Sequence, residues 1–325
     1  MGQASGFLWA YAFHEGGAEP LTDQTFEIPP GDPKAWVWTH FPLSDQRARL
    51  YLENQHDIPA PARDLILRTE QRVQIQFSGH WAFGVLPDLE RDLDGRPVGA
   101  GRLLFAFDGR RLITARRQAL RVVDEVRREV DRGALIASPA DAVVRLIERY
   151  VDVSEQRLHD AAEALDRVED RMLGDHGEVE GLKLGPTRRG LSRDHREYLG
   201  LRSALHRACV PREDHRVALL PQHLPRLAQE AEDLDREAAS LQERARLLHE
   251  ELDTQITSAT NRSMRALTVM SSLLIPPTLI VGAFGMNLSG IPFAGSHSGF
   301  VAACVLCLAV VGGAYWVLRR MRIMP

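Results

Sequence analysis

Two uncharged apolar segments near the C-terminus constrain the fold of this chain more than any other feature. Residues 266–285 and 299–318 contain no Asp, Glu, Lys, Arg or His. A helix of about 20 such residues is long enough to cross about 30 Å of hydrocarbon, and each segment has this length. Because only a short stretch joins the two segments, they predict a helical hairpin embedded in a membrane.

The charges that flank these segments predict their orientation. The connecting residues 286–298 contain no Lys or Arg. Cationic residues near the ends of membrane spans tend to remain in the cytoplasm, so both termini are expected there. No signal peptide is expected, because the N-terminal sequence from Met1 to Pro20 lacks a basic leader followed by an apolar run. The flanking arginines are Arg262, Arg265, Arg319, Arg320 and Arg322.

The part of the chain before the apolar segments is acidic. The whole sequence holds 40 Lys and Arg against 44 Asp and Glu, and the part from position 266 to the C-terminus contains three of the basic residues and no acid. The part before position 266 therefore carries 37 basic and 44 acidic side chains. This balance argues against a nucleic-acid partner and raises the local concentration of cations, although it also serves solubility.

The chain has three cysteines, Cys209, Cys304 and Cys307, which are too few for a disulfide framework and indicate a reducing compartment. Cys304 and Cys307 have a spacing found in metal sites, but no further ligands lie near them in the sequence. We therefore favour helix packing by small residues over metal binding and assign no metal site.

The N-terminal part of the chain, up to about position 135, has a mixed α/β pattern. Helices are predicted from a cap at Ser44 to about Gln55, and from Pro61 to about Glu70. Trp36, Trp38 and His40 alternate along one expected strand, which favours packing within a sheet over catalysis. No glycine-rich phosphate loop, paired metal-binding histidine motif or serine-nucleophile elbow is present. The predicted strands are Gly6–Phe13, Ala35–Phe41, Val73–Phe77, Trp81–Val85, Arg102–Phe107 and Arg111–Ala115.

From about Arg117 the sequence becomes helical and rich in charge. Ser138 provides a cap and Pro139 a first helical residue, and the apolar positions that follow predict a long helix ending near Gly174. Residues 186–210 are expected to return as an antiparallel partner. After Pro225 no strong helix breaker occurs before Pro276 and Pro277, so one helix is predicted from Arg226 to Phe284, entering the membrane from the cytoplasm.

One side of this long helix mixes hydroxyl, amide and apolar side chains. A single helix cannot line a channel, so transport would need several copies around an axis, each presenting this side inward. Packing of the hydroxyls against neighbouring helices explains the same pattern equally well. Read in steps of three or four residues, the positions are Thr278, Ile275, Ser271, Leu267 or Thr268, Met264, Asn261 and Thr257, with Glu250 further below.

At the end of the first apolar segment the chain reads Gly285-Met286-Asn287, and one further span and a short basic tail follow. In this position the motif resembles that of the CorA superfamily of divalent-cation transporters, and the resemblance extends over essentially the whole chain. Three local sequences are more similar to the ZntB-type zinc transporters within that superfamily. They are Ala35-Trp36-Val37-Trp38-Thr39-His40, Leu112-Ile113-Thr114-Ala115-Arg116-Arg117 and the stretch from Phe284 to Pro292.

The resemblance implies a fold and an assembly. The expected fold is an α+β cytoplasmic domain with α/β/α layers, a long helical stalk and two C-terminal transmembrane helices, forming a CorA-like funnel. The expected assembly is a homopentamer in the bacterial inner membrane, with the lipid bilayer and divalent cations as its other partners. The implied segments are a cytoplasmic α/β domain 1–135, a cytoplasmic helical domain and stalk 136–265, transmembrane helix 266–285, periplasmic loop 286–298, transmembrane helix 299–318 and a cytoplasmic basic tail 319–325.

The resemblance also implies roles for single residues. Asn287 becomes an outer selectivity ring, supported by Gly285 and Met286, whose amide oxygens would hold the water shell of a cation. Glu250 is implied as an acidic ring below the membrane, with Asp253 beside it, although charges on an exposed helix are usually solvated. The outer loop has no acid and only His297 as a titratable group. The implied pore-lining residues are Gly282, Thr278, Ile275, Ser271, Leu267, Met264 and Asn261.

Three functions remain open at this stage. The first is Zn²⁺ transport without any cofactor, either import or export, through a central pore, with or without proton coupling. The second is a CorA-type channel for Mg²⁺ or for divalent cations in general, because no Cys, His or carboxylate lies on the intramembrane part of the implied pore face. The third is a membrane-anchored helical scaffold that transports nothing. Neither span contains a titratable carboxylate, histidine or basic residue, so any pH dependence is expected to arise elsewhere. An enzyme is not expected.

Overall fold

The computed structural model describes residues 6–21, 28, 32–69, 72–91, 97–173, 184–210, 222–286 and 297–320. It forms two compact units, one of Met1–Asp170 with Lys183–Leu247 and one of Arg171–Leu182 with Leu248–Pro325. The long helix α6 (Leu224–Phe284) contributes its first part to the first unit and its last part to the second.

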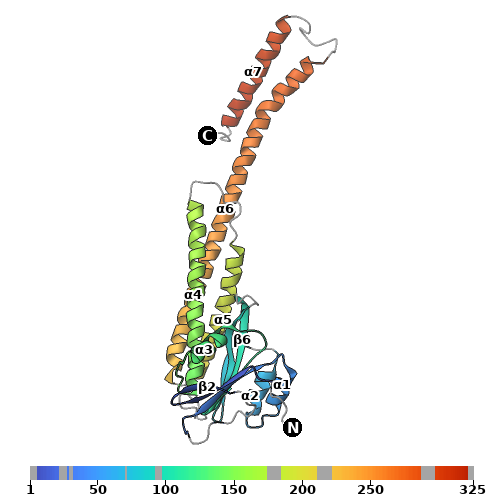
Figure 1. Ribbon diagram of the computed structural model, residues 1–325. Helices are drawn as coiled ribbons and strands as arrows, with labels where there is room; N and C mark the ends of the chain where they lie inside the picture. Colours follow the sequence, from blue (N-terminus) through green and yellow to red (C-terminus); the bar gives the residue numbers. More distant parts are fainter. Residues whose placement is uncertain are drawn as a thin grey trace. The chain divides into compact units, whose positions relative to one another are not determined.

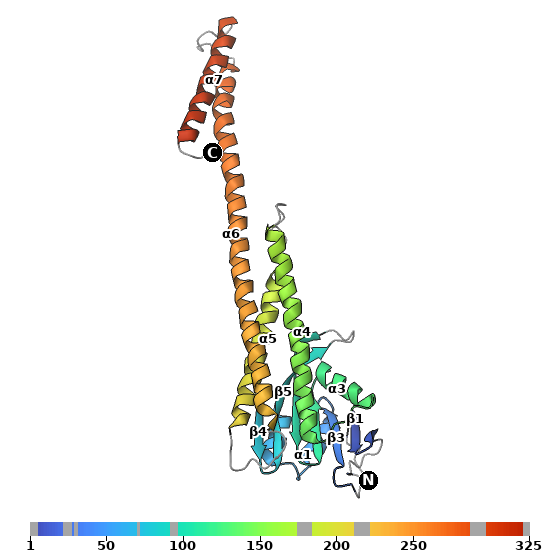
Figure 2. The ribbon, with the colours of Figure 1, turned by 90° about the vertical axis from the view of Figure 1, so that its left-hand side faces the viewer.

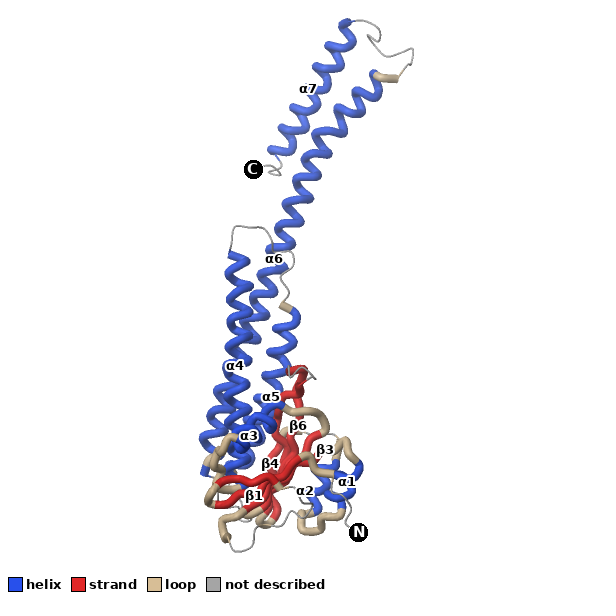
Figure 3. The backbone as a smooth tube through the Cα atoms, in the orientation of Figure 1, coloured by secondary structure: helices blue, strands red, loops and turns tan. Residues whose placement is uncertain are grey.

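The first unit is built on a seven-stranded sheet, drawn in red in Figure 3. Its strand order is β2-β1-β3-β7-β6-β5-β4, and the only parallel pair among these strands is β3 with β7. The strands are β1 (Trp9–His14), β2 (Gly17–Pro20), β3 (Trp36–Pro42), β4 (Gln74–Ser78), β5 (Trp81–Arg91), β6 (Pro97–Phe107) and β7 (Arg111–Arg116).

All six predicted strands are present, with two differences from the prediction. The short strand β2 was not expected, because Gly17–Pro20 has no alternating pattern and is a strand only through its pairing with β1. Strands β5 and β6 are longer than predicted and pair from Ala82 opposite Phe107 to Arg91 opposite Pro97. Gly84 within β5 allows close approach of the neighbouring strand, because a Cβ there would lie 2.1 Å from the carbonyl oxygen of Gln74.

Two short helices cover one face of the sheet, α1 (Gln46–Glu53) and α2 (Ala60–Leu67). Both were predicted, but the cap of α1 is Asp45 and not Ser44. The Asp45 carboxylate accepts a hydrogen bond from the Arg47 N–H at 2.9 Å, and a carboxylate one position later competes successfully with the serine hydroxyl. The core between these helices and the sheet includes Phe41, Leu52, Ile66, Phe83 and Leu104.

The opposite face of the sheet is covered by α3 (Arg121–Asp131), α4 (Pro139–Leu173) and α5 (Gly185–Cys209). The predicted packing role of His40 is confirmed on this face. Its ring is fully buried, stacks on Trp9 with centroids 4.6 Å apart, and lies with Nδ1 2.8 Å from the Thr114 hydroxyl oxygen. Trp38 donates its indole N–H to the same oxygen at 2.9 Å. Burial lowers the pKa of His40 well below its usual value.

Helices α4, α5 and the first part of α6 run side by side (Figures 1 and 2). Ion pairs join them in each combination: Arg157 of α4 with Asp194 of α5 at 2.8 Å, Arg202 of α5 with Asp235 of α6 at 2.8 Å, and Arg244 of α6 with Asp166 of α4 at 2.7 Å. The long helix ending near Gly174, its antiparallel partner and the helix through Pro276 were all predicted, with α4 and α5 within a residue or two of their expected ends.

The second unit contains the last part of α6 and helix α7 (His297–Arg320), which lie beside each other in both views. Helix α6 continues without interruption through Pro276 and Pro277. Two helices of the described chain, Leu224–Phe284 and Ala303–Arg320, are long and apolar enough to cross a membrane. The apolar windows of these helices are 0% and 6% buried, so their side chains require an apolar environment outside the chain.

Candidate ion-conduction helix

The last part of α6 carries the residues that the sequence singled out for a pore. On a helix with 100° per residue, the seven positions from Asn261 to Gly282 fall within about 120° of arc. They therefore form one stripe along the helix, which we call the polar stripe. Met264, Leu267 and Ile275 on this stripe are each about two-thirds exposed within the single chain. The polar stripe comprises Asn261, Met264, Leu267, Ser271, Ile275, Thr278 and Gly282.

The threonines on this side of the helix make a contact that was not anticipated from the sequence. The Thr278 hydroxyl donates to the carbonyl oxygen of Leu274 at 2.7 Å, and the Thr268 hydroxyl donates to that of Met264 at 2.9 Å. Below them, Thr257 donates to Asp253 in the same way at 2.8 Å. Each hydroxyl donates its only proton to a carbonyl oxygen of its own helix, so the lone pairs of the hydroxyl oxygen remain free to accept hydrogen bonds from outside the helix. Such a surface suits cations and the water molecules bound to them.

The opposite side of α6 faces α7. The Cys307 thiol of α7 lies 4.0 Å from the Pro277 carbonyl oxygen, at the distance of a weak S–H···O contact. Pro277 lies about 140° around the helix from Gly282 and about 160° from Ile275. Helix α7 therefore covers the proline side, and among the described residues it leaves the polar stripe uncovered. Cys307 has a packing contact of the kind expected for a small residue between helices.

The Gly285-Met286-Asn287 motif begins directly after the C-terminal end of α6. The Gly285 N–H donates to the Val281 carbonyl at 2.9 Å, and the Met286 N–H donates to Ala283 at 3.3 Å, so these two residues complete the last turn. Met286 is about half exposed. Asn287 and the rest of the connecting segment up to residue 296 lie outside the described residues.

The two acids expected below the membrane, Glu250 and Asp253, are both exposed on α6. The Asp253 carboxylate lies 3.7 Å from Nε2 of His249, one helical turn before it. His249 was not among the predicted site residues, although its spacing of four positions from Asp253 was visible in the sequence. Within the described residues no three His, Cys, Asp or Glu side chains gather closely enough to hold a metal ion.

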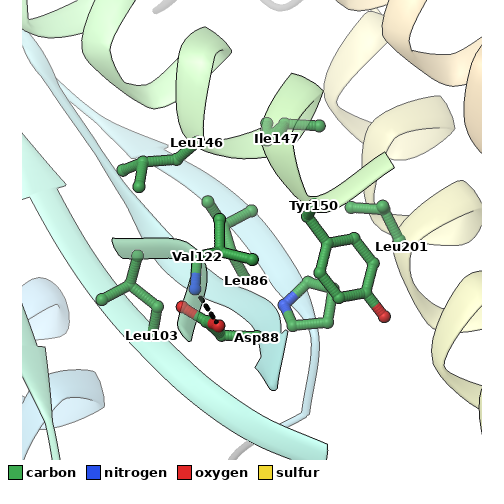
Figure 4. A pocket seen from close by; sticks show the side chains of 9 residues that line it. Leu86, Asp88, Leu103, Val122, Leu146, Ile147, Tyr150 and Leu201 are labelled. Atoms are coloured by element: carbon green, nitrogen blue, oxygen red, sulfur yellow. Dashed lines mark hydrogen bonds between the residues drawn. The ribbon is translucent and has the colours of Figure 1, made fainter. Parts of the chain in front are cut away.

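A buried acid in the first unit was also missed by the sequence reasoning. Asp88 of β5 is 1% exposed, and its carboxylate accepts a hydrogen bond from the N–H group of Val122 at 2.8 Å (Figure 4). It accepts a second hydrogen bond from the N–H group of Val123 at 3.2 Å. It also accepts one from Leu89 at 2.6 Å. Leu120, the residue at the cap position of α3, makes no side-chain cap, so Asp88 caps α3 from the neighbouring strand.

Mostly apolar side chains line a small cavity beside Asp88. This cavity of about 10 Å³, room for about one water molecule, is lined by Asp88 together with side chains of β5, β6, α3, α4 and α5. Burial raises the pKa of Asp88 to about 7; the three backbone N–H groups oppose this rise, and the negative charge of Asp124 adds to it. The other side chains lining the cavity are those of Leu86, Pro87, Leu103, Val122, Leu146, Ile147, Tyr150 and Leu201.

A layered sheet domain, a long helix that continues into an apolar hairpin, and a polar stripe on the side of that helix away from its neighbour are together typical of membrane proteins that carry ions. The chain belongs to the family described as CorA-like Mg²⁺ transporter protein, which matches residues 33–320. Divalent-cation transport is the activity that this family supports for the chain, and its members are transporters and not enzymes.

Individual relatives agree with this assignment over nearly the whole chain. The zinc transport protein ZntB of Pectobacterium atrosepticum is 23% identical over 98% of this chain and 96% of its own length. The divalent cation transporter CmaX of Pseudomonas aeruginosa is 24% identical over 99% and 98%. The solved structure of full-length CmaX, 22% identical, superposes with a TM-score of 0.83 over 99% of each chain. These likenesses confirm the predicted CorA-like fold.

Proposed function

We propose that this protein is a homopentameric transporter that moves Zn²⁺ across the bacterial inner membrane through a central pore lined by α6. The observation that carries the proposal is the polar stripe, because it faces away from α7 and presents oxygen acceptors along a membrane-spanning helix. Five copies around an axis would enclose this stripe and hide it from lipid. Similarity to proteins named zinc transport protein ZntB supports zinc as the ion.

The polar stripe and the predicted residues at its two ends each have a role in this proposal. Asn287 forms the outer ring that holds the hydrated ion, with Gly285 and Met286 shaping the turn beneath it. Ile275, Leu267 and Met264 form apolar rings that close the pore by excluding water. Gly282, Thr278, Ser271 and Asn261 line the levels between them with small or polar groups. Glu250 and Asp253 form acidic rings that gather cations at the inner mouth.

The topology follows from the same proposal. Residues 266–285 and 299–318 span the membrane, the connecting residues 286–298 lie in the periplasm, and both termini lie in the cytoplasm. Residues 1–135 and 136–265 then form the cytoplasmic α/β domain and the helical stalk of a funnel. Proton coupling, where it occurs, acts through groups outside the spans, because the two spans contain no titratable carboxylate, histidine or basic residue.

A channel for Mg²⁺ or for divalent cations in general is the second candidate. The intramembrane stripe offers only hydroxyl, amide and apolar groups, and none of the Cys, His or carboxylate ligands that distinguish zinc from harder cations. Similarity to a protein named divalent cation transporter CmaX favours the same broader activity.

A flux assay in liposomes tests the proposal. The purified protein is reconstituted with an internal zinc-responsive or magnesium-responsive dye, and entry of each ion is compared for the parent, Asn287→Ala and the matched control Asn54→Ala, with and without a pH gradient. Zinc-selective entry in the parent, with the selectivity lost in Asn287→Ala and kept in Asn54→Ala, supports the proposal. Equal or faster Mg²⁺ entry favours the second candidate, and no entry of either ion from verified pentamers refutes both.

The orientation of α6 has its own test. In a background with Cys209, Cys304 and Cys307 replaced by Ala, a cysteine is placed at Ile275 on the polar stripe or at Met270, which is similarly exposed but lies about 140° around the helix. A water-soluble thiol reagent should block flux through the Ile275→Cys protein and leave the Met270→Cys protein active. Equal reaction at both positions contradicts a pore lined by the stripe.

A further inference from the structure

The exposed side of α5 carries an unbalanced positive charge. Arg189, Arg193 and Arg196 lie within about 60° of arc on this helix and are all exposed. Within the described part of the chain, none of the three has an ion pair or a side-chain hydrogen bond. We call these residues the arginine face. Most of the other arginines that the structure describes in the first unit contact a carboxylate or a carbonyl oxygen, as Arg157, Arg202 and Arg244 do.

The acids of α5 do not neutralise this face, because they point into the molecule. Asp194 forms a two-oxygen contact with Arg157 of α4, with both distances 2.8 Å. Glu197 pairs with Arg102 of β6 at 2.7 Å. Both acids of α5 are therefore paired with arginines of neighbouring elements and do not neutralise the arginine face. An anionic partner for this face must come from outside the subunit.

A surface of opposite charge lies where α4 meets α6. It consists of Asp152 and Glu155 on α4 and Glu230 and Glu237 on α6, and we call it the acidic seam. Arg226 of α6 pairs with Glu148 of α4. Asp152 and Glu155 follow Glu148 by four and seven positions, and Glu230 and Glu237 follow Arg226 by four and eleven, so all four acids lie on the sides where these two helices meet. Burial raises the pKa of Glu155, and the charges of Asp152, Glu230 and Glu237 raise it further, in agreement with this placement. Asp152 and Glu230 each contact an arginine of their own helix, whereas neither Glu155 nor Glu237 has an ion pair within the described residues.

The two surfaces lie on opposite sides of the three-helix arrangement. On α5, the residues that contact α4 and α6 are Asp194 and Arg202, and both lie about 140° around the helix from Arg189. On α4, Arg157 faces α5 and lies about 160° from Glu155. The arginine face and the acidic seam of one subunit therefore cannot meet each other, although their charges are complementary.

We propose that the arginine face of one subunit docks on the acidic seam of the next subunit around the ring. Two different complementary surfaces used head to tail generate a closed ring when the rotation between copies closes. Their spacings match, because Arg189 and Arg196 are seven positions apart, as are Glu230 and Glu237, which is about 10 Å along each helix. Arginine suits this role because its planar group pairs well with carboxylates at interfaces.

This interface deepens the proposed function and rests on the pentamer in it. Exposed ion pairs contribute little affinity. The main effects of this interface are therefore to orient neighbouring subunits and to disfavour other arrangements of the subunits. The apolar hairpins supply contact area in the membrane. The charged surfaces set the relative orientation of the cytoplasmic domains of neighbouring subunits. A contact of this kind weakens as salt screens it.

Cross-linking between two differently tagged chains tests the interface directly. In the background with all three native cysteines replaced by Ala, one chain carries Arg193→Cys and the other Glu237→Cys, and co-expressed pentamers in detergent are treated with a short bis-maleimide. The control pair replaces Arg193→Cys by Arg128→Cys, an exposed arginine of α3. The proposal expects a dimer of unlike chains in the first pair, reduced about tenfold in the control and reduced by high salt.

Charge reversal provides the complementary test. Arg189→Glu with Arg196→Glu should reduce the cross-link about tenfold, and adding Glu155→Arg with Glu230→Arg to the partner chain should restore it. The reversal Arg128→Glu with Arg132→Glu makes the same change in net charge and should leave the cross-link intact. If the Arg193→Cys and Glu237→Cys pair without charge reversal cross-links no better than the control pair, this interface is overturned while the proposed transporter still stands. A wild-type protein that is monomeric in native mass spectrometry overturns the pentamer and the interface together.

Discussion

Replacing Asp88 by Asn should change how the stability of the sheet domain depends on pH. The carboxylate is 1% exposed and contacts backbone N–H groups of Leu89, Val122 and Val123, with no cation among its described contacts. Asn keeps the shape and an accepting oxygen but carries no charge at any pH. The substitution therefore removes the titration of this one group while preserving much of its cap on α3.

The sign and size follow from the raised pKa of Asp88, about 7 in the fold against 3.8 without it. A raised carboxyl pKa means that the fold favours the protonated form, so this contribution to stability is complete below about pH 4 and is lost as the pH rises towards 7. The shift of about three units corresponds to about 4 kcal/mol in total. Between pH 5 and pH 8 the wild type should lose about 3 kcal/mol relative to Asp88→Asn.

Urea unfolding followed by tryptophan fluorescence measures this difference. Four of the five tryptophans, at positions 9, 36, 38 and 81, lie in the first unit, so a Trp316→Phe background confines the signal to it. The full-length protein is unfolded in detergent at pH 5, 6, 7 and 8, and the free energy of unfolding is compared between the parent and Asp88→Asn. Asp64→Asn, at an exposed position of α2, serves as the matched control.

The comparison is decisive because every other titrating group is common to both proteins. If the free-energy difference between the parent and Asp88→Asn stays constant from pH 5 to pH 8, then the three N–H donors fully offset burial and the reasoning is wrong. If Asp64→Asn shows the same dependence as Asp88→Asn, the effect belongs to the overall charge and not to the buried cap.

Three further substitutions test separate parts of the structure. Gly84→Ala should destabilise the sheet domain by about 3 kcal/mol or more in the same urea assay, because the new Cβ would lie 2.1 Å from the Gln74 carbonyl oxygen; an unchanged midpoint would contradict this. Ser138→Ala should cost about 1 kcal/mol, seen as a lower thermal midpoint, because the hydroxyl accepts from the Asp141 N–H at 3.2 Å; a Ser138→Thr protein should stay close to the parent. Ile275→Ser should raise Zn²⁺ entry into liposomes several-fold by wetting an apolar ring, and slower entry would argue against a gate there.

The features that the sequence predicted well are those set by neighbours in the chain. Helix α6 was predicted nearly to its ends, because no breaker occurs in it before the proline pair and membrane surroundings tolerate that pair. The cap at Ser138 and the polar stripe also depend on spacings of three or four residues. Alternation of apolar residues was enough to locate six strands, and β2 escaped because its pairing with β1 is its only strand signal.

The features that the sequence did not predict are contacts between residues that lie far apart in the chain. Asp88 caps a helix whose first N–H groups lie 34 and 35 positions away, and nothing in its local sequence distinguishes it from a surface turn. The acidic seam needs the crossing of α4 with α6, and the direction of the arginine face needs the packing of α5. Charge along a helix was visible beforehand, but which charges are paired was not.

The lining of the proposed pore depends on residues close together in the chain, whereas its selectivity depends on how several chains are arranged. The lining of α6 is a local property, because each threonine hydroxyl is turned to its own backbone one helical turn earlier and presents acceptors to whatever lies in front of it. In the proposed pore, such a lining would favour cations over anions without distinguishing zinc from magnesium, since no ligand on it is specific for either. Discrimination would then come from the geometry of the proposed ring of several chains, to which Asn287 would contribute one amide per subunit. A single Asn287 substitution should therefore change the preference between ions as well as the rate, whereas a change at Ile275 should alter the rate for both ions alike.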